Sequence, residues 1–331
     1  MSYVLPYIFL LGGFVLLVKG ADVFVEGSSG IARFFKIPSL IIGLTIVAFG
    51  TSAPEAAVSI TASITGQTGI AVGNVSGSNI FNILAVLGVC AMIRPIHVHR
   101  SIMNRDYLLM LIACAMFFAV SADMWLGTSS TGIVSRGDGI VLALLFCVFM
   151  YMTIQSGLKG RKEAPKLPDE PHEAPQPEKA EKPVKLPKSI IMAVLGLAGV
   201  IIGGQLVVNG ASAIAKSFGA SETLIGVTVV AIGTSLPELV TSIMASRKGE
   251  NDMAVGNVIG SNLFNVLFVI AASSIISPLT LDMESVIDMI IMLGVSIMVY
   301  FFAVTKQKIN RVEGGIMTAL YIAYTAFAIV R

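Results

Sequence analysis

Charged residues are scarce in this chain. They make up 13% of its 331 residues, the net charge is +2, and there are three histidines, three cysteines and one tryptophan. So small a net charge gives no indication of a nucleic-acid partner, and we expect none. The cysteines, Cys90, Cys114 and Cys147, lie in or beside apolar sequence at a spacing that fits no metal site. We therefore interpret them as small buried hydrophobic residues.

Apolar sequence is correspondingly abundant. Hydrophobic residues make up 55% of the chain and the mean hydropathy is +0.85, more than a soluble domain needs. About ten stretches reach the roughly 20 residues that a membrane-spanning helix requires. They lie near 3–25, 38–63, 69–92, 105–121, 138–157, 189–214, 222–246, 252–275, 285–304 and 312–330. The sequence therefore predicts an all-α polytopic membrane protein surrounded by lipid.

One segment differs in composition from the rest. Residues 158–188 are rich in Pro, Lys and Glu, a composition that cannot bury a core and is typical of disorder. We expect a first membrane unit at 1–157, a linker at 158–188 and a second membrane unit at 189–331.

The distribution of Lys and Arg predicts the orientation in the membrane. If the N-terminus is outside, all but four of the 22 Lys and Arg residues fall in the inside loops and the linker. The exceptions are Lys19 within the first predicted helix and Arg136, Lys216 and Arg331 outside. Cytoplasmic loops carry the excess of Lys and Arg. We therefore expect both termini outside and the linker in the cytoplasm.

A pair of motifs occurs twice. GTSAPE at 50–55 and GNVSGSNIFN at 73–82 return as GTSLPE at 233–238 and GNVIGSNLFN at 256–265. The offset is 183 residues, and segments 42–84 and 225–267 agree at about 26 of 43 positions, which indicates a duplicated half. Five helices per half is an odd number, so the second half enters the membrane from the opposite side. The result is two five-helix inverted-topology repeats, a plan common in secondary transporters.

Each copy of the motif places one carboxylate at membrane depth. Glu55 and Glu238 hold equivalent positions, and an ionisable residue inside the membrane is costly and marks a functional site by default. The alternative is a structural polar pair that bonds one helix to another. Duplication together with matching hydroxyl groups favours the functional interpretation.

The residues around each glutamate offer oxygen ligands. Pro54 and Pro237 predict helix kinks that free the carbonyl groups of Gly50 and Gly233, and unpaired backbone at membrane depth survives only beside a cavity or a ligand. Hydroxyl and amide oxygens come from Thr51, Ser52, Ser78 and Asn82 in the first half, and from Thr234, Ser235, Ser261 and Asn265 in the second. Such a hard, all-oxygen set suits Ca²⁺ or Na⁺ rather than Zn²⁺ or Cu²⁺.

Charge arithmetic suggests what this site does. Two facing carboxylates repel each other, and one Ca²⁺ or two Na⁺ would neutralise both. An empty charged site is unfavourable in a low-dielectric setting, so one ion leaves when another replaces it, which is a route to exchange. We expect an antiporter without a bound cofactor.

An intramembrane enzyme would need a nucleophile with its base or a His-ligated metal, and no histidine lies in a predicted span. A cation channel stays open as an alternative, although channels usually need an oligomeric ring or a wide lumen.

The paired motifs resemble the two alpha-repeats of the calcium/cation antiporter superfamily, most closely those of the prokaryotic sodium/calcium exchangers. The resemblance covers the whole ten-helix plan. It implies Ca²⁺ and Na⁺ as substrates that compete at a central site, and a first helix in each half that slides past a fixed core. It adds the main-chain carbonyl groups of Ala48 and Ala231 to the ligands named above. We expect a monomer in a plasma (inner) membrane.

The asparagines at the ends of the second motif bear on the coupling ion. Some family members have Asp at the position of Asn265, a pattern of the potassium-dependent branch, whereas this chain has Asn at both Asn82 and Asn265. That difference argues against a K⁺ requirement. Proton-coupled relatives carry a second Glu in the GN-motif region, which is absent here. The resemblance therefore favours Na⁺ coupling, with Ca²⁺/H⁺ exchange as the alternative.

Two further acidic residues lie in the first predicted helix. Asp22 and Glu26 correspond to Gln205 and Asn209 at the same offset, so their charge is not repeated. We interpret them either as the lining of an entrance or as residues at a helix end near the cytoplasmic surface.

Overall fold

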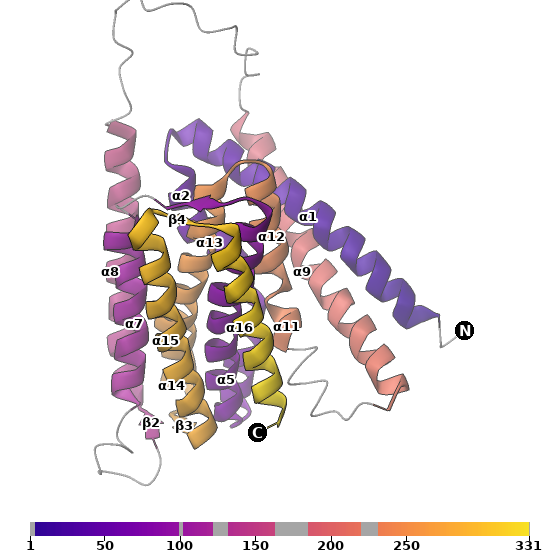
Figure 1. Ribbon diagram of the computed structural model, residues 1–331, viewed down its shortest axis with the longest axis vertical. Coiled ribbons are helices and arrows are strands. Elements are labelled where there is room, and N and C mark those ends of the chain that lie inside the picture. Colours follow the sequence, from indigo (N-terminus) through magenta and orange to yellow (C-terminus); the bar gives the residue numbers. More distant parts are fainter. Residues whose placement is uncertain (1–3, 99–101, 122–131, 163–184, 220–230, 331) are drawn as a thin grey trace, which may run out of the picture.

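The described part of the chain folds almost entirely into helices that stand side by side, with α1 and α9 leaning away from the others (Figure 1). The computed structural model describes residues 4–98, 102–121, 132–162, 185–219 and 231–330. In that part of the chain, eight helices are long and apolar enough to cross a membrane, and a bent pair raises the number to as many as nine. The predicted span at 222–246 lies partly outside the described residues. The structure confirms a helical membrane protein, and the tenth span stays a prediction.

The described residues of the first half form eight α-helices and three π-helical segments. They are α1 (Leu5–Phe35), α2 (Ser39–Ile42), η1 (Gly43–Val47), α3 (Ala48–Thr51), α4 (Ala53–Ile64), α5 (Thr68–Phe81), η2 (Asn82–Val86), α6 (Leu87–Ile93), η3 (Ile102–Tyr107), α7 (Leu108–Val120) and α8 (Arg136–Lys162). Helix α8 continues into the predicted linker, whose residues 163–184 lie outside the described residues.

The second half repeats much of this order. Its described helices are α9 (Leu186–Ser217), α11 (Ala231–Thr234), α12 (Leu236–Arg247), α13 (Asn251–Phe264), η6 (Asn265–Val269), α14 (Ile270–Ile276), α15 (Met283–Lys306) and α16 (Arg311–Val330).

Helix α1 is the main departure from the predicted spans, because it runs ten residues beyond its expected end. It stops where Lys36 adopts the left-handed conformation (φ 54°) and its N–H caps the carbonyl groups of Ala32 and Arg33. Asp22 and Glu26 therefore lie within the helix, and their assignment to a helix end was wrong.

The predicted kink in the GTSxPE motif is present as a break. Helices α3 and α4 meet at Ser52 and enclose a bend of 48°. Proline at the start of α4 needs no N–H partner, because the first-turn N–H groups of a helix have no intrahelical acceptor. The second half breaks in the same way at Ser235, whose φ and ψ of −93° and 4° match the −84° and 7° of Ser52.

The repeated asparagines begin π-helical turns. Asn82 opens η2 and Asn265 opens η6, so both halves widen at the same motif residue. Single π-helical turns inside α-helices are frequent at functional sites. The sequence motif therefore marks a local change of helix geometry, which side-chain periodicity did not predict.

Two small antiparallel sheets tie the halves together at opposite ends of the molecule (Figure 1). Strand β1 (Ile96–His97) pairs with β4 (Lys308–Ile309), and β2 (Gly132–Val134) pairs with β3 (Leu279–Leu281). Strands β1 and β3 are separated by the same offset of 183 residues as the motifs, and yet they lie at opposite ends. This is the placement that two halves of inverted topology require.

Helices α1 and α9 pack along a seam of glycines. A Cβ atom added to Gly20 would lie 2.7 Å from the backbone carbon of Gly199, and one added to Gly203 would lie 2.5 Å from the N of Leu17. Gly13 and Gly27 are equally close to the backbone of α9. Small residues allow helix backbones to approach closely inside membranes. The two helices that open the two halves therefore form one tightly packed antiparallel pair.

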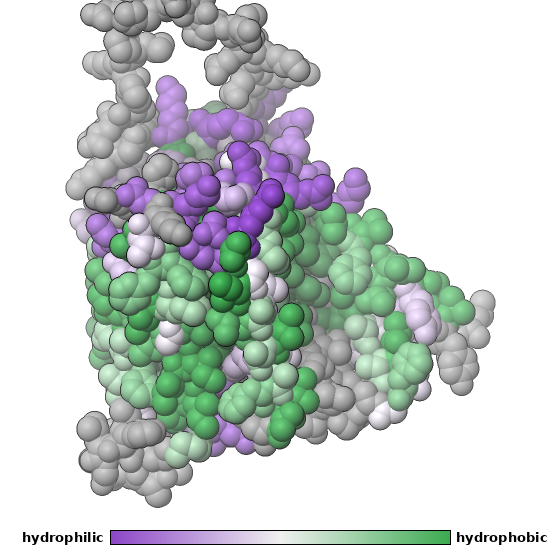
Figure 2. Space-filling model, in the orientation of Figure 1, coloured by the Kyte–Doolittle hydropathy of each residue, from purple (hydrophilic) through white to green (hydrophobic). Residues whose placement is uncertain are grey.

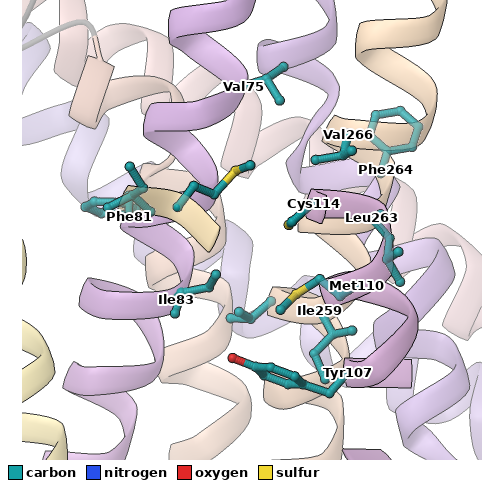
Figure 3. Close-up of a cluster of buried hydrophobic side chains, with 14 of the residues drawn as sticks. Val75, Phe81, Ile83, Tyr107, Met110, Cys114, Ile259, Leu263, Phe264 and Val266 are labelled. Atoms are coloured by element: carbon teal, nitrogen blue, oxygen red, sulfur yellow. The ribbon is translucent and has the colours of Figure 1, made fainter. Parts of the chain in front are cut away.

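Apolar side chains fill the space between the remaining helices. Figure 3 shows Tyr107, the last residue of η3, and Met110 of α7 beside Ile259 and Leu263 of α13. The hydroxyl group of Tyr107 donates to the carbonyl group of Ser296, 2.9 Å away, so the ring carries no unpaired polar atom into the core. This packing holds α13, and with it the second motif, in a fixed position.

The surface indicates how the molecule meets its surroundings. Figure 2 shows a broad hydrophobic belt, with hydrophilic residues gathered at the end where α8 finishes and α9 begins. The start of α1 and the end of α16 lie towards the other end of the bundle (Figure 1).

Candidate functional site

Two glutamates lie in the middle of the bundle, each in the first turn of a helix that follows a break. Glu55 belongs to α4 and Glu238 to α12, and both side chains are fully buried, with 0% exposure. The positive end of a helix dipole favours a carboxylate in the first turn. The break therefore does two things: it buries the carboxylate, and it aims a helix N-terminus at it.

Each carboxylate is bound by a serine from the other half. The hydroxyl group of Ser52 donates to Oε1 of Glu238 at 2.8 Å, and that of Ser235 donates to Oε1 of Glu55 at 2.9 Å. Both serines sit at the helix breaks. The two breaks thus face each other across the boundary between the halves, and the carboxylates share one site.

Other predicted oxygens join this site. Ser78 Oγ lies 3.0 Å from Ser235 Oγ, and the hydroxyl group of Ser261 donates to the main-chain carbonyl group of Ala48 at 3.4 Å. Thr51 is fully buried in α3, where its hydroxyl group is 3.1 Å from the carbonyl oxygen of Val47. Helix α11 begins at Ala231 and ends at Thr234, directly before the break at Ser235. The structure therefore brings Ser78 to the break at Ser235 and Ser261 to α3 of the other half, while Thr234 and Ala231 are placed only by their position in α11.

The amides of Asn82 and Asn265 complete the predicted set, and two unpredicted asparagines hold them. Asn82 Nδ2 donates to Asn262 Oδ1, and Asn265 Nδ2 donates to Asn79 Oδ1, both at 3.1 Å. All four side chains are fully buried. Asn79 and Asn262 occupy equivalent positions in the duplicated SNxFN segment, so their repetition was a signal that could have identified them.

A second unpredicted pair supports the backbone of the glutamates. Asn74 Nδ2 donates to the carbonyl group of Glu55 at 3.2 Å and to Ser59 Oγ at 2.9 Å. Asn257 makes the same contacts with Glu238 and Ser242, at 3.4 Å and 2.9 Å. These asparagines tie the second motif to the helix that carries the carboxylate within each half, so every such contact occurs twice.

Four buried oxygens of the site have no hydrogen-bond partner. They are Oε2 of Glu55, Oε2 of Glu238, Oδ1 of Asn82 and Oδ1 of Asn265. Nearly all buried polar atoms in proteins find a partner, and leaving them unpaired is costly. All four are acceptors in matched pairs from the two halves, which is the chemistry that a bound cation would satisfy. The described residues contain no cluster of three or more His, Cys, Asp and Glu side chains, so the site relies on mixed carboxylate, hydroxyl and amide oxygens.

The hydrogen bonds to the carboxylates come from neutral groups. Within the described ranges no basic side chain pairs with Glu55 or Glu238, and the ion pairs there involve Asp22, Glu26 and Asp106. A buried carboxylate pair without cationic partners is strongly unfavourable unless a positive charge is supplied. Bound cations or protons would supply that charge.

Comparisons with known proteins agree with this chemistry. The family model described as sodium/calcium exchanger protein matches residues 5–155 and 188–330. A putative antiporter, CaxA, from Alkalimonas amylolytica is 40% identical over 96% of both chains. The sodium/calcium exchanger MaX1 from Methanosarcina acetivorans is 32% identical over 96% of this chain and 97% of its own.

A solved structure gives the same result for the fold. The sodium-calcium exchanger NCX_Mj, soaked with Na⁺ and Ca²⁺, superposes with a TM-score of 0.82 at 34% identity, covering 98% of each chain. The family match and these relatives span nearly the whole length. The chain belongs to the sodium/calcium exchanger protein family, as its repeats predicted, and is a transmembrane antiporter of that family.

Proposed function

We propose that this protein exports Ca²⁺ in exchange for Na⁺ that enters through the same site. The observation that carries the proposal is the set of four buried, unpartnered oxygens on Glu55, Glu238, Asn82 and Asn265. Ca²⁺ takes six to eight oxygen ligands in flexible geometry, and the serine hydroxyls beside the carboxylates add to this number. NCX_Mj and MaX1 are both named as exchangers of sodium and calcium, which supports the same pair of ions here.

Competition at the site explains why transport would be coupled. Two carboxylates that face each other without a basic partner need about two positive charges, from one Ca²⁺ or two Na⁺. The empty site is unfavourable, so the protein changes the side of the membrane to which the site opens only when Ca²⁺ or Na⁺ is bound. The main-chain carbonyl groups of Ala48 and Ala231 are proposed as further ligands, because these residues begin α3 and α11, the short helices that end at the two breaks.

We propose the matching architecture: ten spans in two five-helix inverted repeats at 1–157 and 189–331, joined by a cytoplasmic linker, with both termini outside. The two sheets at opposite ends of the molecule and the excess of Lys and Arg near the linker support this arrangement. A monomer suffices, because the bonds that cross the site join the two halves of one chain. An inner membrane fits the Escherichia coli relative YrbG, which is named an inner membrane protein and is 38% identical over 82% of this chain.

Proton coupling is the second candidate. One oxygen of each buried carboxylate is free of hydrogen bonds and is therefore able to carry a proton instead of a share of Ca²⁺. Ca²⁺/H⁺ exchange at the same residues would leave the geometry unchanged, so the two functions are separated by which gradient drives transport.

Uptake of radioactive Ca²⁺ into proteoliposomes tests the proposal. Vesicles are loaded with Na⁺, with K⁺, or with buffer that imposes a pH gradient, and Glu55→Gln serves as the inactive control. We expect uptake only with the outward Na⁺ gradient. Uptake driven by the pH gradient alone would replace Na⁺ with H⁺, and uptake without any counter-ion gradient would indicate a channel.

A further inference from the structure

Four asparagines form a closed network where α5 meets α13. Asn79 Nδ2 donates to the main-chain carbonyl group of Asn262 at 3.3 Å, and Asn262 Nδ2 donates to that of Asn79 at 3.4 Å. The remaining oxygen of each side chain accepts a bond from Asn265 or Asn82. Every bond in the network joins one half of the protein to the other.

The backbone carbonyl groups fix the orientation of all four amides. A carbonyl oxygen only accepts hydrogen bonds, so the Asn79 atom beside the carbonyl group of Asn262 must be the NH₂ group. The oxygen of Asn79 then points to the other side, and the Asn265 atom that contacts it must again be an NH₂ group. The same reasoning runs from Asn262 to Asn82.

This orientation decides the sign of the interaction with a cation. With its NH₂ group engaged, Asn265 is left with a buried Oδ1 that has no partner, and Asn82 is left with the same atom. Half a turn about the last side-chain bond would exchange oxygen for NH₂ and place hydrogens, with their positive partial charge, where oxygen now lies. The amide would then repel a cation instead of binding it.

We propose that Asn79 and Asn262 are positioning residues that act across the two halves: Asn79 keeps the oxygen of Asn265 available to the cation, and Asn262 does the same for Asn82. The proposal rests on the cation site proposed above and extends it to two side chains that do not themselves present a free oxygen. It assigns each positioning residue to one ligand only, namely the ligand of the opposite half.

Double-mutant cycles on the purified full-length protein test this pairing, with Ca²⁺ affinity measured by titration calorimetry in Na⁺-free buffer. We expect Asn79→Ala to weaken Ca²⁺ binding by about tenfold or more, the usual effect of losing an outer-shell partner. Asn79→Ala combined with Asn265→Ala should bind within about twofold of Asn265→Ala alone, because the residue it orients is gone. Asn79→Ala combined with Asn82→Ala should instead show both losses multiplied. Asn262→Ala gives the mirror-image cycles.

If Asn79 had a purely structural role, Asn79→Ala would lower Ca²⁺ affinity by the same factor in the Asn265→Ala and the Asn82→Ala backgrounds. That result would overturn the proposal. Asn79→Asp provides a second variant if the alanine protein does not fold, since its protonated carboxyl group can donate to the carbonyl group of Asn262 and keep an oxygen for the NH₂ group of Asn265. We expect its Ca²⁺ affinity to be no weaker than that of the wild type, and a tenfold loss would contradict the proposal.

Glu55→Gln separates this proposal from the function on which it rests. If the wild type binds no Ca²⁺, or if binding survives in Glu55→Gln, the proposed site fails and the positioning role fails with it. If Glu55→Gln removes Ca²⁺ binding but the two double-mutant cycles give equal losses of Ca²⁺ affinity, only the positioning role is wrong.

Discussion

The two halves of the chain are nearly interchangeable at the centre and different at the edge. At the centre, the bond from Ser52 to Glu238 is mirrored by that from Ser235 to Glu55, at 2.8 Å and 2.9 Å. At the edge near the linker, Lys248 binds Asp22 of α1 at 2.9 Å and lies 3.8 Å from Glu26.

The mirror positions at the other edge are uncharged. Gln205 and Asn209, which correspond to Asp22 and Glu26, bond to each other at 2.9 Å, and Thr65, which corresponds to Lys248, bonds to its own helix. The difference teaches that the proposed ion site draws equally on both halves, whereas the contacts at the two edges do not. Substitutions of mirror residues should therefore have equal effects at the centre and unequal effects at the edge.

Removing a central charge gives the largest expected effect. Glu55→Gln and Glu238→Gln should each reduce Ca²⁺ exchange to background, because one carboxylate no longer balances the incoming charge. Exchange is measured in proteoliposomes, with size-exclusion chromatography to confirm folding. Wild-type activity in either variant would refute the site, and loss in only one would break the symmetry argument.

Removing a crossing hydroxyl group should have a smaller but still symmetric effect. Ser52→Ala and Ser235→Ala each delete one hydrogen bond to a carboxylate, and such bonds contribute about 1.5–3 kcal/mol. We expect each variant to bind Ca²⁺ about tenfold or more weakly by calorimetry, with equal losses. Ser63→Ala, whose hydroxyl group bonds only within α4 at 3.0 Å, is the matched control and should bind normally.

Adding a third carboxylate sharpens the comparison of the two amides. Asn265→Asp introduces a charge and cannot donate to Asn79 Oδ1, so it should change the preference among Ca²⁺, Na⁺ and K⁺ or the pH dependence of exchange. Asn82→Asp, its mirror, should do the same. Competition of unlabelled ions with radioactive Ca²⁺ measures the change. An unaltered profile would mean that the position is not a ligand.

The glycine seam offers a symmetric test outside the site. Gly20→Ala and Gly203→Ala place a Cβ atom within 2.7 Å and 2.5 Å of opposing backbone, and overpacking typically destabilises by about 1–3 kcal/mol. Both should lower the melting temperature in detergent. Gly12→Ala, on the exposed side of α1 with nothing within 4 Å, should not. Equal stability of all three would argue against a packed seam.

Breaking the edge contact should have the smallest effect. Lys248 and Asp22 are partly exposed, at 29% and 40%, and an exposed ion pair contributes about 0.2–1 kcal/mol. Lys248→Gln should alter the exchange rate by no more than about fivefold and should remove its dependence on ionic strength, set with choline chloride. Loss of exchange in this variant would place Lys248 in the transport machinery instead.

The sequence predicted much of this molecule because the fold is a duplication. Two matching motifs identified the glutamates, the hydroxyl groups and the helix breaks, since prolines and buried charges inside apolar helices leave few physical options. Nine of the predicted spans correspond to described helices, with small differences at most ends. The end of α1 was missed because Lys36 stops the helix through its backbone conformation, which composition does not reveal.

The contacts across the site could not be predicted in the same way. Which serine binds which carboxylate depends on how the halves pack, and the motif is equally consistent with bonds inside one half. Ser52 illustrates this, because its hydroxyl group donates to Glu238 of the other half and not to Glu55, three residues away in its own half. The roles of Asn79 and Asn262 were likewise hidden, although their repetition was visible.

The most direct test of the account is a structure determined with Ca²⁺ in the absence of Na⁺ and again at high Na⁺. We predict Ca²⁺ density within about 2.3–2.6 Å of oxygens from both Glu55 and Glu238, lost when Na⁺ is raised. Ca²⁺ bound elsewhere, or held at this site regardless of Na⁺, would contradict the claim that the two ions compete for one symmetric pair of carboxylates.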